Sequence, residues 1–289
     1  FPFPGTTELA SAANITGGTS SFSEHRIEGY FSQVSYSLKD KYLASASFRR
    51  DGTSRFFEDA RWGNFYSIGA GWRISEEDFL SADWIDELKL RGSYGEQGNE
   101  RTSSVYQWQG LYGLGWNNGL NPGAMVENLA ARDLQWETNA NFNIGADFRL
   151  FNKVDGTVEY FQRTSDNLLF QVQLPYSSAG DLRQWANVGT MTNKGWEIQV
   201  GYNAISTSDF DWRIDLNATT FKNEITKLPN GDPIINGSKR LAEGKDVYAF
   251  WAREYMGVDS KNGDALYRAD PKLYNPSSAA YQIIGSDTV

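Results

Sequence analysis

The sequence predicts an all-β protein: an antiparallel transmembrane β-barrel segment with about eight long amphipathic strands, short periplasmic turns and long extracellular loops. Three observations predict this fold class. Apolar and polar side chains alternate over long stretches, the connections between these stretches alternate in length, and aromatic residues stand near both of their ends. A period of two residues indicates β-strands, because the face of a helix repeats every 3.6 residues.

The clearest strand covers residues 134–150, LQWETNANFNIGADFRL. Its even positions carry the apolar side chains, for example Phe142 and Ile144, and its odd positions carry asparagines and charged residues. It is longer than the strands of about five or six residues that are usual in soluble sheets. Alternation with apolar residues again at even numbers predicts seven further strands, at 27–38, 41–50, 64–73, 88–97, 154–163, 196–204 and 211–221.

The predicted connections alternate between short and long. Residues 39–40, 152–153 and 206–210 are short turns, whereas the stretches 51–63, 98–133, 164–195 and 225 onward are long and rich in Gly, Asn and Ser. Short turns on one rim and long loops on the other are typical of outer-membrane barrels. Residues 74–88 break the rule, because they connect strands on the short side but are long enough for a helical turn or two.

Aromatic residues predict where the strands meet the two membrane surfaces. Amphipathic rings favour the headgroup level of a bilayer and aliphatic chains favour the hydrocarbon. Val34, Ile68 and Ile144 are aliphatic residues near the middle of their strands. Near the short turns, the expected girdle is Tyr42, Trp72, Tyr202 and Trp212. Near the long loops, it is Phe48, Tyr66, Tyr94, Trp136, Tyr160 and Trp196.

Composition excludes several classes of function. The formal net charge of −9 and the pI near 4.8 argue against a nucleic-acid partner, which requires a basic surface. The chain has no cysteine and a single histidine, His25, which is interpreted as a polar residue at a loop edge. It contains no nucleophile elbow, P-loop or dinucleotide-binding fingerprint. We therefore expect no enzymatic activity, no metal and no cofactor.

Ligand contacts are expected from the long loops and from the polar face of the sheet. Exposed tryptophans can stack on a sugar ring or hold an apolar peptide side chain, although packing of the loops or contact with a partner protein is the preferred interpretation. The candidates in the loops are Trp108, Trp116, Trp185 and Trp251. The polar candidates facing the lumen are Arg49, Arg91, Glu137, Asp147, Glu159 and Arg163, for which plug contact and solvation are preferred over substrate binding.

Several stretches together resemble a known family, the SusC/RagA-type TonB-dependent transporters of the Gram-negative outer membrane. They are residues 29–56, 62–80, 88–99, 134–152, 187–203 and 240–267, and the resemblance covers about residues 27–285 in family order. It implies a 22-stranded barrel that is closed by an amino-terminal plug and imports an oligosaccharide or oligopeptide. TonB and the proton-motive force would drive that import, and a SusD-like surface lipoprotein would be the partner.

The resemblance also divides the chain. It implies an extracellular loop at 1–26, barrel strands and loops at 27–224, and one long extracellular loop at 225–289, where alternation alone suggests two further strands. The chain is expected to be the middle to C-terminal part of a barrel, without the plug or the region that contacts TonB. Two alternatives remain open: a passive porin-like channel and a soluble β-sandwich binding module. Loop composition does not distinguish glycan from peptide cargo.

Overall fold

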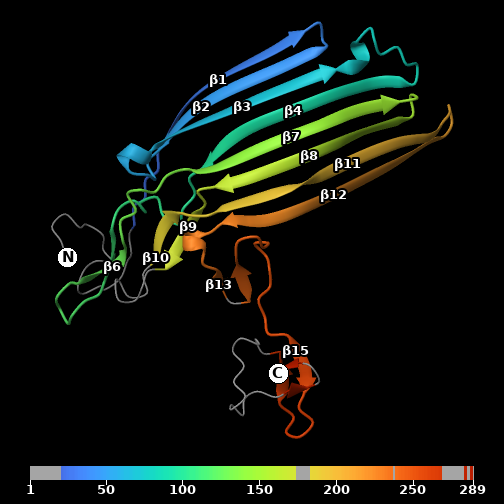
Figure 1. The fold of residues 1–289 in the computed structure, drawn as a ribbon. Helices are drawn as coiled ribbons and strands as arrows, with labels where there is room; N and C mark the ends of the chain where they lie inside the picture. Colours follow the sequence, from blue (N-terminus) through green and yellow to red (C-terminus); the bar gives the residue numbers. More distant parts are fainter. Residues whose placement is uncertain (1–20, 174–182, 237, 269–282, 285–286, 289) are drawn as a thin grey trace.

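A computed structural model describes residues 21–173, 183–236, 238–268, 283–284 and 287–288. Its main feature is one curved, antiparallel eight-stranded sheet in the order β1-β2-β3-β4-β7-β8-β11-β12, so that chain neighbours are also spatial neighbours (Figure 1). The strands are β1 (Ile27–Leu38), β2 (Tyr42–Thr53), β3 (Trp62–Arg73), β4 (Ile85–Asn99), β7 (Glu137–Leu150), β8 (Val154–Asp166), β11 (Thr190–Ser206) and β12 (Asp211–Lys227).

All eight predicted strands are confirmed, and most of them extend further toward the long loops than predicted. The strand predicted at 196–204, for example, is β11 (Thr190–Ser206). Its first residues, TMTNKG, are almost all polar or glycine, so they carry no apolar alternation. Backbone pairing with β8 and β12 nevertheless continues through them, which a hydrophobic pattern does not reveal.

The register of the sheet places the apolar positions of all eight strands on one face. Tyr42 pairs with Trp72, Tyr94 with Phe142, and Trp196 with Tyr160, so even-numbered residues lie opposite even-numbered residues. Directly opposite residues project to the same side of a sheet. We call this even-numbered side the apolar face and the odd-numbered side the polar face.

The apolar face is uncovered. Ile68, Ile144 and Leu216, near the middle of their strands, are 58%, 54% and 67% exposed. In the described part of the chain the remaining strands form only small two-stranded sheets, so no second large sheet packs on the first. This arrangement contradicts the β-sandwich alternative, because a sandwich buries one face of each sheet against the other.

One end of the sheet, the turn end, carries the short connections. Lys39 and Asp40, and likewise Phe151 and Asn152, have φ between +53° and +56°. Two consecutive left-handed residues characterise a type I′ turn, whose twist matches that of the strands, and the register leaves three residues between the paired strand ends of each hairpin. The longer connection at 74–84 begins with the short 3-10 helix Ile74–Glu76, as the sequence predicted for this exception.

The opposite end, the loop end, carries small hairpins. They are β5 (Leu111–Leu114) with β6 (Ala124–Asn128), β9 (Leu169–Gln173) with β10 (Arg183–Asn187), β13 (Ile234–Asn236) with β14 (Lys239–Leu241), β15 (Tyr255–Val258) with β16 (Ala265–Tyr267), and β17 (Ile283–Ile284) with β18 (Asp287–Thr288). In the described residues after β12, no strand joins the large sheet, which contradicts the two further strands that alternation suggested. No described helix is long and apolar enough to cross a membrane.

Candidate functional site: the polar face and the loop end of the sheet

The polar face carries a connected ionic network that includes three of the predicted residues. Arg91 on β4 donates from Nε to Asp147 on β7 at 3.2 Å and forms a short ion pair through Nη1 with Glu159 on β8. Lys89 lies 3.8 Å from the same aspartate, and the Thr157 hydroxyl donates to it at 3.1 Å. Two cations and two acids thus compensate one another, leaving no excess of either charge for a ligand.

A second network on the polar face was missed from the sequence. Arg213 on β12 donates to both carboxylate oxygens of Asp155 on β8 at 2.8 Å each, and its Nε donates to Asp215 at 2.9 Å. The arginine crosses the intervening strand β11 at Gly201, where an added Cβ would lie 1.9 Å from Nη2. The odd number of Arg213 was enough to assign it to the polar face. Its partners could not be identified, because they depend on strand order and register.

A groove of about 550 Å³ indents the polar face toward the loop end. Arg49 lines it and donates from Nε to Asp51 at 2.5 Å. Asp51 is only 7% exposed, and its second oxygen has no hydrogen-bond partner among the described residues. The other lining side chains include Ser47, Phe65, Ser67, Gln97, Glu100 and Trp136. Hydroxyls, amides, charges and rings together are suited to a polar ligand that carries apolar faces.

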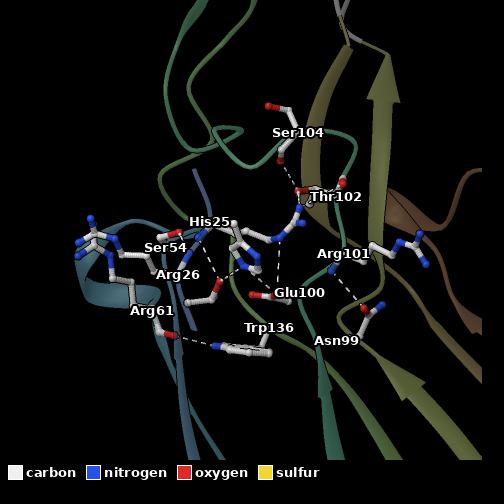
Figure 2. A network of polar contacts seen from close by, with 12 residues as sticks. His25, Arg26, Ser54, Arg61, Asn99, Glu100, Arg101, Thr102, Ser104 and Trp136 are labelled. Carbon is white, nitrogen blue, oxygen red and sulfur yellow. Dashed lines mark hydrogen bonds and ion pairs between the residues drawn. The ribbon is translucent and has the colours of Figure 1, made fainter. Parts of the chain in front are cut away.

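A polar cluster borders this groove at the loop end (Figure 2). Glu100 lies 3.1 Å from Nε2 of His25 and forms a salt bridge with Arg55 at 3.6 Å. The Nε2 atom of His25 also lies 3.3 Å from the Thr53 hydroxyl, and Arg55 reaches the carbonyl of Thr102 at 3.4 Å. His25, interpreted from the sequence as a loop-edge polar residue, therefore joins the residues before β1 to the ends of β2 and β4.

The four predicted loop tryptophans separate into two pairs. Trp108 donates from Nε1 to the Ser54 carbonyl at 3.2 Å and packs against Phe57. Trp185 packs against the small buried cluster of the loops, Phe56, Ala131 and Leu134. Trp116 and Trp251 instead are 60% and 49% exposed, and the Arg240 guanidinium lies 4.3 Å from the centre of the Trp251 ring. The second pair therefore offers more ring surface to a ligand or partner than the half-buried first pair, although Arg240 covers part of the Trp251 ring.

The two remaining polar candidates lie apart from the ionic networks. Glu137 is 9% exposed and accepts from the Asn139 side chain and from the Leu169 backbone, at 3.1 and 3.2 Å. It therefore ties the start of β7 to β9. Arg163 lies 5.4 Å from the ring of Phe161, its neighbour on the same face.

Most predicted girdle residues lie on the apolar face, but Trp136 does not. Trp136 precedes β7 and packs against Phe56 and Phe65 at ring distances of 5.7 and 5.5 Å, while its Nε1 donates to the Arg61 carbonyl at 2.8 Å. Phe65 belongs to the polar face, so the girdle prediction for Trp136 is wrong. The strand begins at Glu137, and strand alternation therefore does not fix the direction of the preceding side chain.

Two further aromatic pairs, which the predicted girdles did not include, lie near the two ends of the sheet. Near the loop end, Trp62 stacks on Tyr30 at 6.2 Å, and Arg50 lies 5.2 Å from the centre of the Trp62 ring. At the turn end, Trp84 stacks on Phe151 at 5.7 Å. Tyr30 lies inside the strand predicted at 27–38 but was not assigned to a girdle, and Trp62 lies just before the strand predicted at 64–73.

The connection at 74–84 is fixed to the turn end through one carboxylate. Glu77 accepts from the Tyr42 hydroxyl at 2.5 Å and from Trp72 Nε1 at 3.0 Å, and Lys41 lies 3.5 Å away. The Tyr42 hydrogen bond and then the Trp72 hydrogen bond lower the pKa of Glu77 below its ordinary value of about 4.5. Burial opposes them, and the charge of Lys41 adds a still smaller lowering effect. This carboxylate is therefore structural.

The geometry of the polar face suits the lining of a water-filled space and the binding of a ligand. Among the described residues no three metal-ligating side chains gather into a cluster. A sheet that exposes an aliphatic band between aromatic rows on one face and carries ionic networks on the other is a segment of a transmembrane β-barrel, with lipid outside and water inside.

Comparisons with known proteins agree with this class. Residues 3–286 match the family described as "TonB dependent receptor-like, beta-barrel". The chain belongs to this family, whose members are outer-membrane barrel proteins of Gram-negative bacteria, receptors and transporters rather than enzymes. The predicted fold class, family and location are thereby confirmed.

Two curated relatives illustrate the similarity. The chain is 34% identical over 262 residues to TonB-dependent receptor P39 of Formosa agariphila, which covers 89% of this chain and 25% of that protein. It is 33% identical over 257 residues to TonB-dependent receptor SusC of Bacteroides thetaiotaomicron, which covers 83% of this chain and 25% of that protein. The chain thus spans about a quarter of the length of these relatives.

Solved structures show the same arrangement of strands. The structure of the RagAB peptide transporter superposes with a TM-score of 0.79 at 27% identity, covering 95% of this chain and 30% of the other. The RagAB peptide importer in its "closed-closed" state gives 0.78 at 27% identity, covering 94% of this chain and 31% of the other.

Proposed function

We propose that this chain forms part of an outer-membrane importer that takes up an oligosaccharide or oligopeptide with energy supplied through TonB. One observation carries the proposal: all eight strands place most of their apolar residues on a single exposed face, and the ionic networks of Arg91 and Arg213 lie on the other. Membership of the TonB-dependent receptor family supports active rather than passive passage. Similarity to SusC and to RagAB supports nutrients as the cargo.

In this proposal the apolar face contacts lipid. Tyr42, Trp72, Tyr202 and Trp212 lie at the periplasmic surface of the membrane, and Phe48, Tyr66, Tyr94, Tyr160 and Trp196 lie at the outer surface. Seven of these nine rings are more than a third exposed, and Tyr94 and Tyr160 are partly covered by aromatic neighbours. Rings at these two levels, with aliphatic residues between them, match the interfacial preference of aromatic side chains.

The polar face lines the lumen, and the loop end faces the cell exterior. Residues 27–224 form the barrel wall with its loops, and residues 1–26 and 225–289 belong to extracellular loops. The groove with Arg49 and the exposed rings of Trp116 and Trp251 are the surfaces for substrate or for a SusD-like surface lipoprotein. The two cations Lys89 and Arg91 balance the charges of Asp147 and Glu159, which suits contact with a plug better than capture of a charged ligand.

Uptake measurements on the natural-length protein in its own outer membrane test the proposal. Cells with and without the gene are supplied with fluorescent oligosaccharides or oligopeptides, in the presence or absence of a protonophore. Import should require both the gene and the proton-motive force. Gene-dependent uptake that persists with the protonophore would establish a passive channel instead. The cargo that loses its uptake on gene deletion identifies the substrate class.

A further inference from the structure

Two lysines face each other on the apolar face near the loop end. Lys194 on β11 and Lys222 on β12 are direct cross-strand partners, and both side chains are exposed. Like charges directly opposite each other destabilise a sheet. Glu224 lies 2.7 Å from Lys222 and within electrostatic range of Lys194, whereas Lys194 forms no salt bridge in the part of the chain described. The trio therefore keeps one uncompensated positive charge.

The position of this pair along the strands is informative. Lys194 is the next residue of the apolar face after Trp196 in the direction of the loop end. The ring of Trp196 packs edge-on against Tyr160 at 5.3 Å. On β12, ten positions separate Lys222 from Trp212 of the opposite aromatic row. This separation corresponds to about 33 Å along a strand. At a tilt of about 40° it becomes about 25 Å along the membrane normal, the height of the apolar band of such barrels. The two lysines thus lie at the outer edge of the apolar band.

We propose that Lys194 and Lys222 bind the phosphate of a lipid headgroup in the outer leaflet. A phosphate between the two ammonium groups replaces their mutual repulsion with two charge-assisted hydrogen bonds, while the acyl chains of the same lipid continue down the apolar face past Trp196. A lipid is favoured over a protein partner because both lysines project from the apolar face. The residues that follow them on this face toward the turn end are exposed rings and aliphatic side chains. The inference rests on the proposed membrane orientation and is independent of import activity.

Binding of lipid A to the natural-length protein tests this site. Protein purified in a neutral detergent is titrated with lipid A, and the bound lipid is counted by native mass spectrometry. The double variant Lys194→Gln/Lys222→Gln should bind lipid A about 30-fold more weakly, from the usual contribution of a basic residue at an anionic surface. Each single variant should lose about fivefold. Lys194→Arg/Lys222→Arg should retain binding, because the charge and the donors remain.

Matched controls distinguish a site from general charge. Lys39→Gln/Lys153→Gln removes the same charge at the turn end and should leave the affinity unchanged; an equal loss there would overturn the proposal. Dephosphorylated lipid A should bind the wild-type protein no more tightly than it binds the double variant. Equal lipid A affinity of wild type and double variant, or displacement of lipid A by equimolar inorganic phosphate, would also overturn it. Normal uptake by the double variant would show that import is a separate property.

Discussion

Arg213 on β12 and Asp155 on β8 form a two-pronged ion pair although another strand lies between them. Both hydrogen bonds are 2.8 Å long, and the arginine passes over β11 at Gly201, where there is no side chain to obstruct it. Arg91 on β4 reaches Glu159 on β8 in the same way, across Gly145 on β7. Each arginine therefore links three neighbouring strands on the polar face.

A side chain at Gly201 should disrupt this link. In Gly201→Val the new Cβ would occupy the position of Arg213 Nη2, so the guanidinium must leave Asp155. The pair is partly exposed, with side-chain exposures of 38% and 37%, so water and salt weaken the link, and steric strain adds to the loss of stability. The midpoint of urea unfolding in detergent should fall, and most at low salt.

Gly92→Ala is the matched control for this change, because the nearest atom to its added Cβ is 3.7 Å away. Arg213→Gln should reproduce the salt-dependent part of the loss without the strain. If Gly201→Val unfolds at the wild-type midpoint, the arginine link does not stabilise the sheet.

The two faces of β7 should respond oppositely to the same charged residue. Ile144 is 54% exposed at the middle of the apolar face, so Ile144→Arg would place a guanidinium in hydrocarbon at a cost of about 2–4 kcal/mol. Asn143→Arg, one residue away on the polar face, would point into water. We expect Ile144→Arg alone to reduce the amount of folded protein in the outer membrane, measured by quantitative immunoblotting. Equal loss in both variants would contradict the assignment of the faces.

Alternation predicted the strands and their faces because a bilayer imposes the same demand at every second residue. Ile68, Ile144 and Ile198 each identify the apolar side of their own strand without information from any neighbour. The partners of Arg213 could not be predicted in this way, since Asp155 is fifty-eight residues distant and becomes close only through strand order and register. Trp136 was misassigned because it lies before its strand, where loop packing decides the direction of the side chain.

Acidification should release the connection at 74–84 from the turn end. The pKa of Glu77 is lowered in the folded protein, so its carboxylate stabilises the connection above its unfolded pKa near 4.5. That stabilisation is lost as the pH falls from about 4.5 through the lower folded pKa, where Tyr42 and Trp72 lose their acceptor. The protection of residues 74–84 against hydrogen exchange, relative to the unfolded chain at the same pH, should fall over this interval. Glu77→Gln should remove the pH dependence and Glu76→Gln should keep it; an unchanged profile in Glu77→Gln would exclude this carboxylate as the cause.

Trp136 should stabilise the loops rather than the attachment to the membrane. Its ring packs on Phe56 and Phe65 beside the buried cluster with Leu134. Trp136→Ala should therefore lower the stability of that cluster by about 2–3 kcal/mol. We expect faster proteolysis of residues 100–136, with unchanged migration of the barrel in native gels. Trp196→Ala, which removes an exposed ring from the apolar face, should leave the loops as resistant as in wild type. Unchanged resistance of the loops to proteolysis in Trp136→Ala would show that Trp136 does not stabilise the loops.

The exposed pair of loop tryptophans should contribute to substrate capture, and the packed pair should not. Trp116 and Trp251 are about half exposed or more, with Arg240 over one side of Trp251, whereas Trp185 packs beside Leu134 and the Trp108 indole donates to a loop carbonyl. Loss of one stacking ring should weaken the apparent affinity for import about tenfold in Trp116→Ala or Trp251→Ala, at unchanged maximal rate. Trp108→Phe keeps the packed ring and removes only the indole donor, so its import affinity should equal that of wild type. An unaltered affinity in both alanine variants would assign these rings to contact with another protein instead.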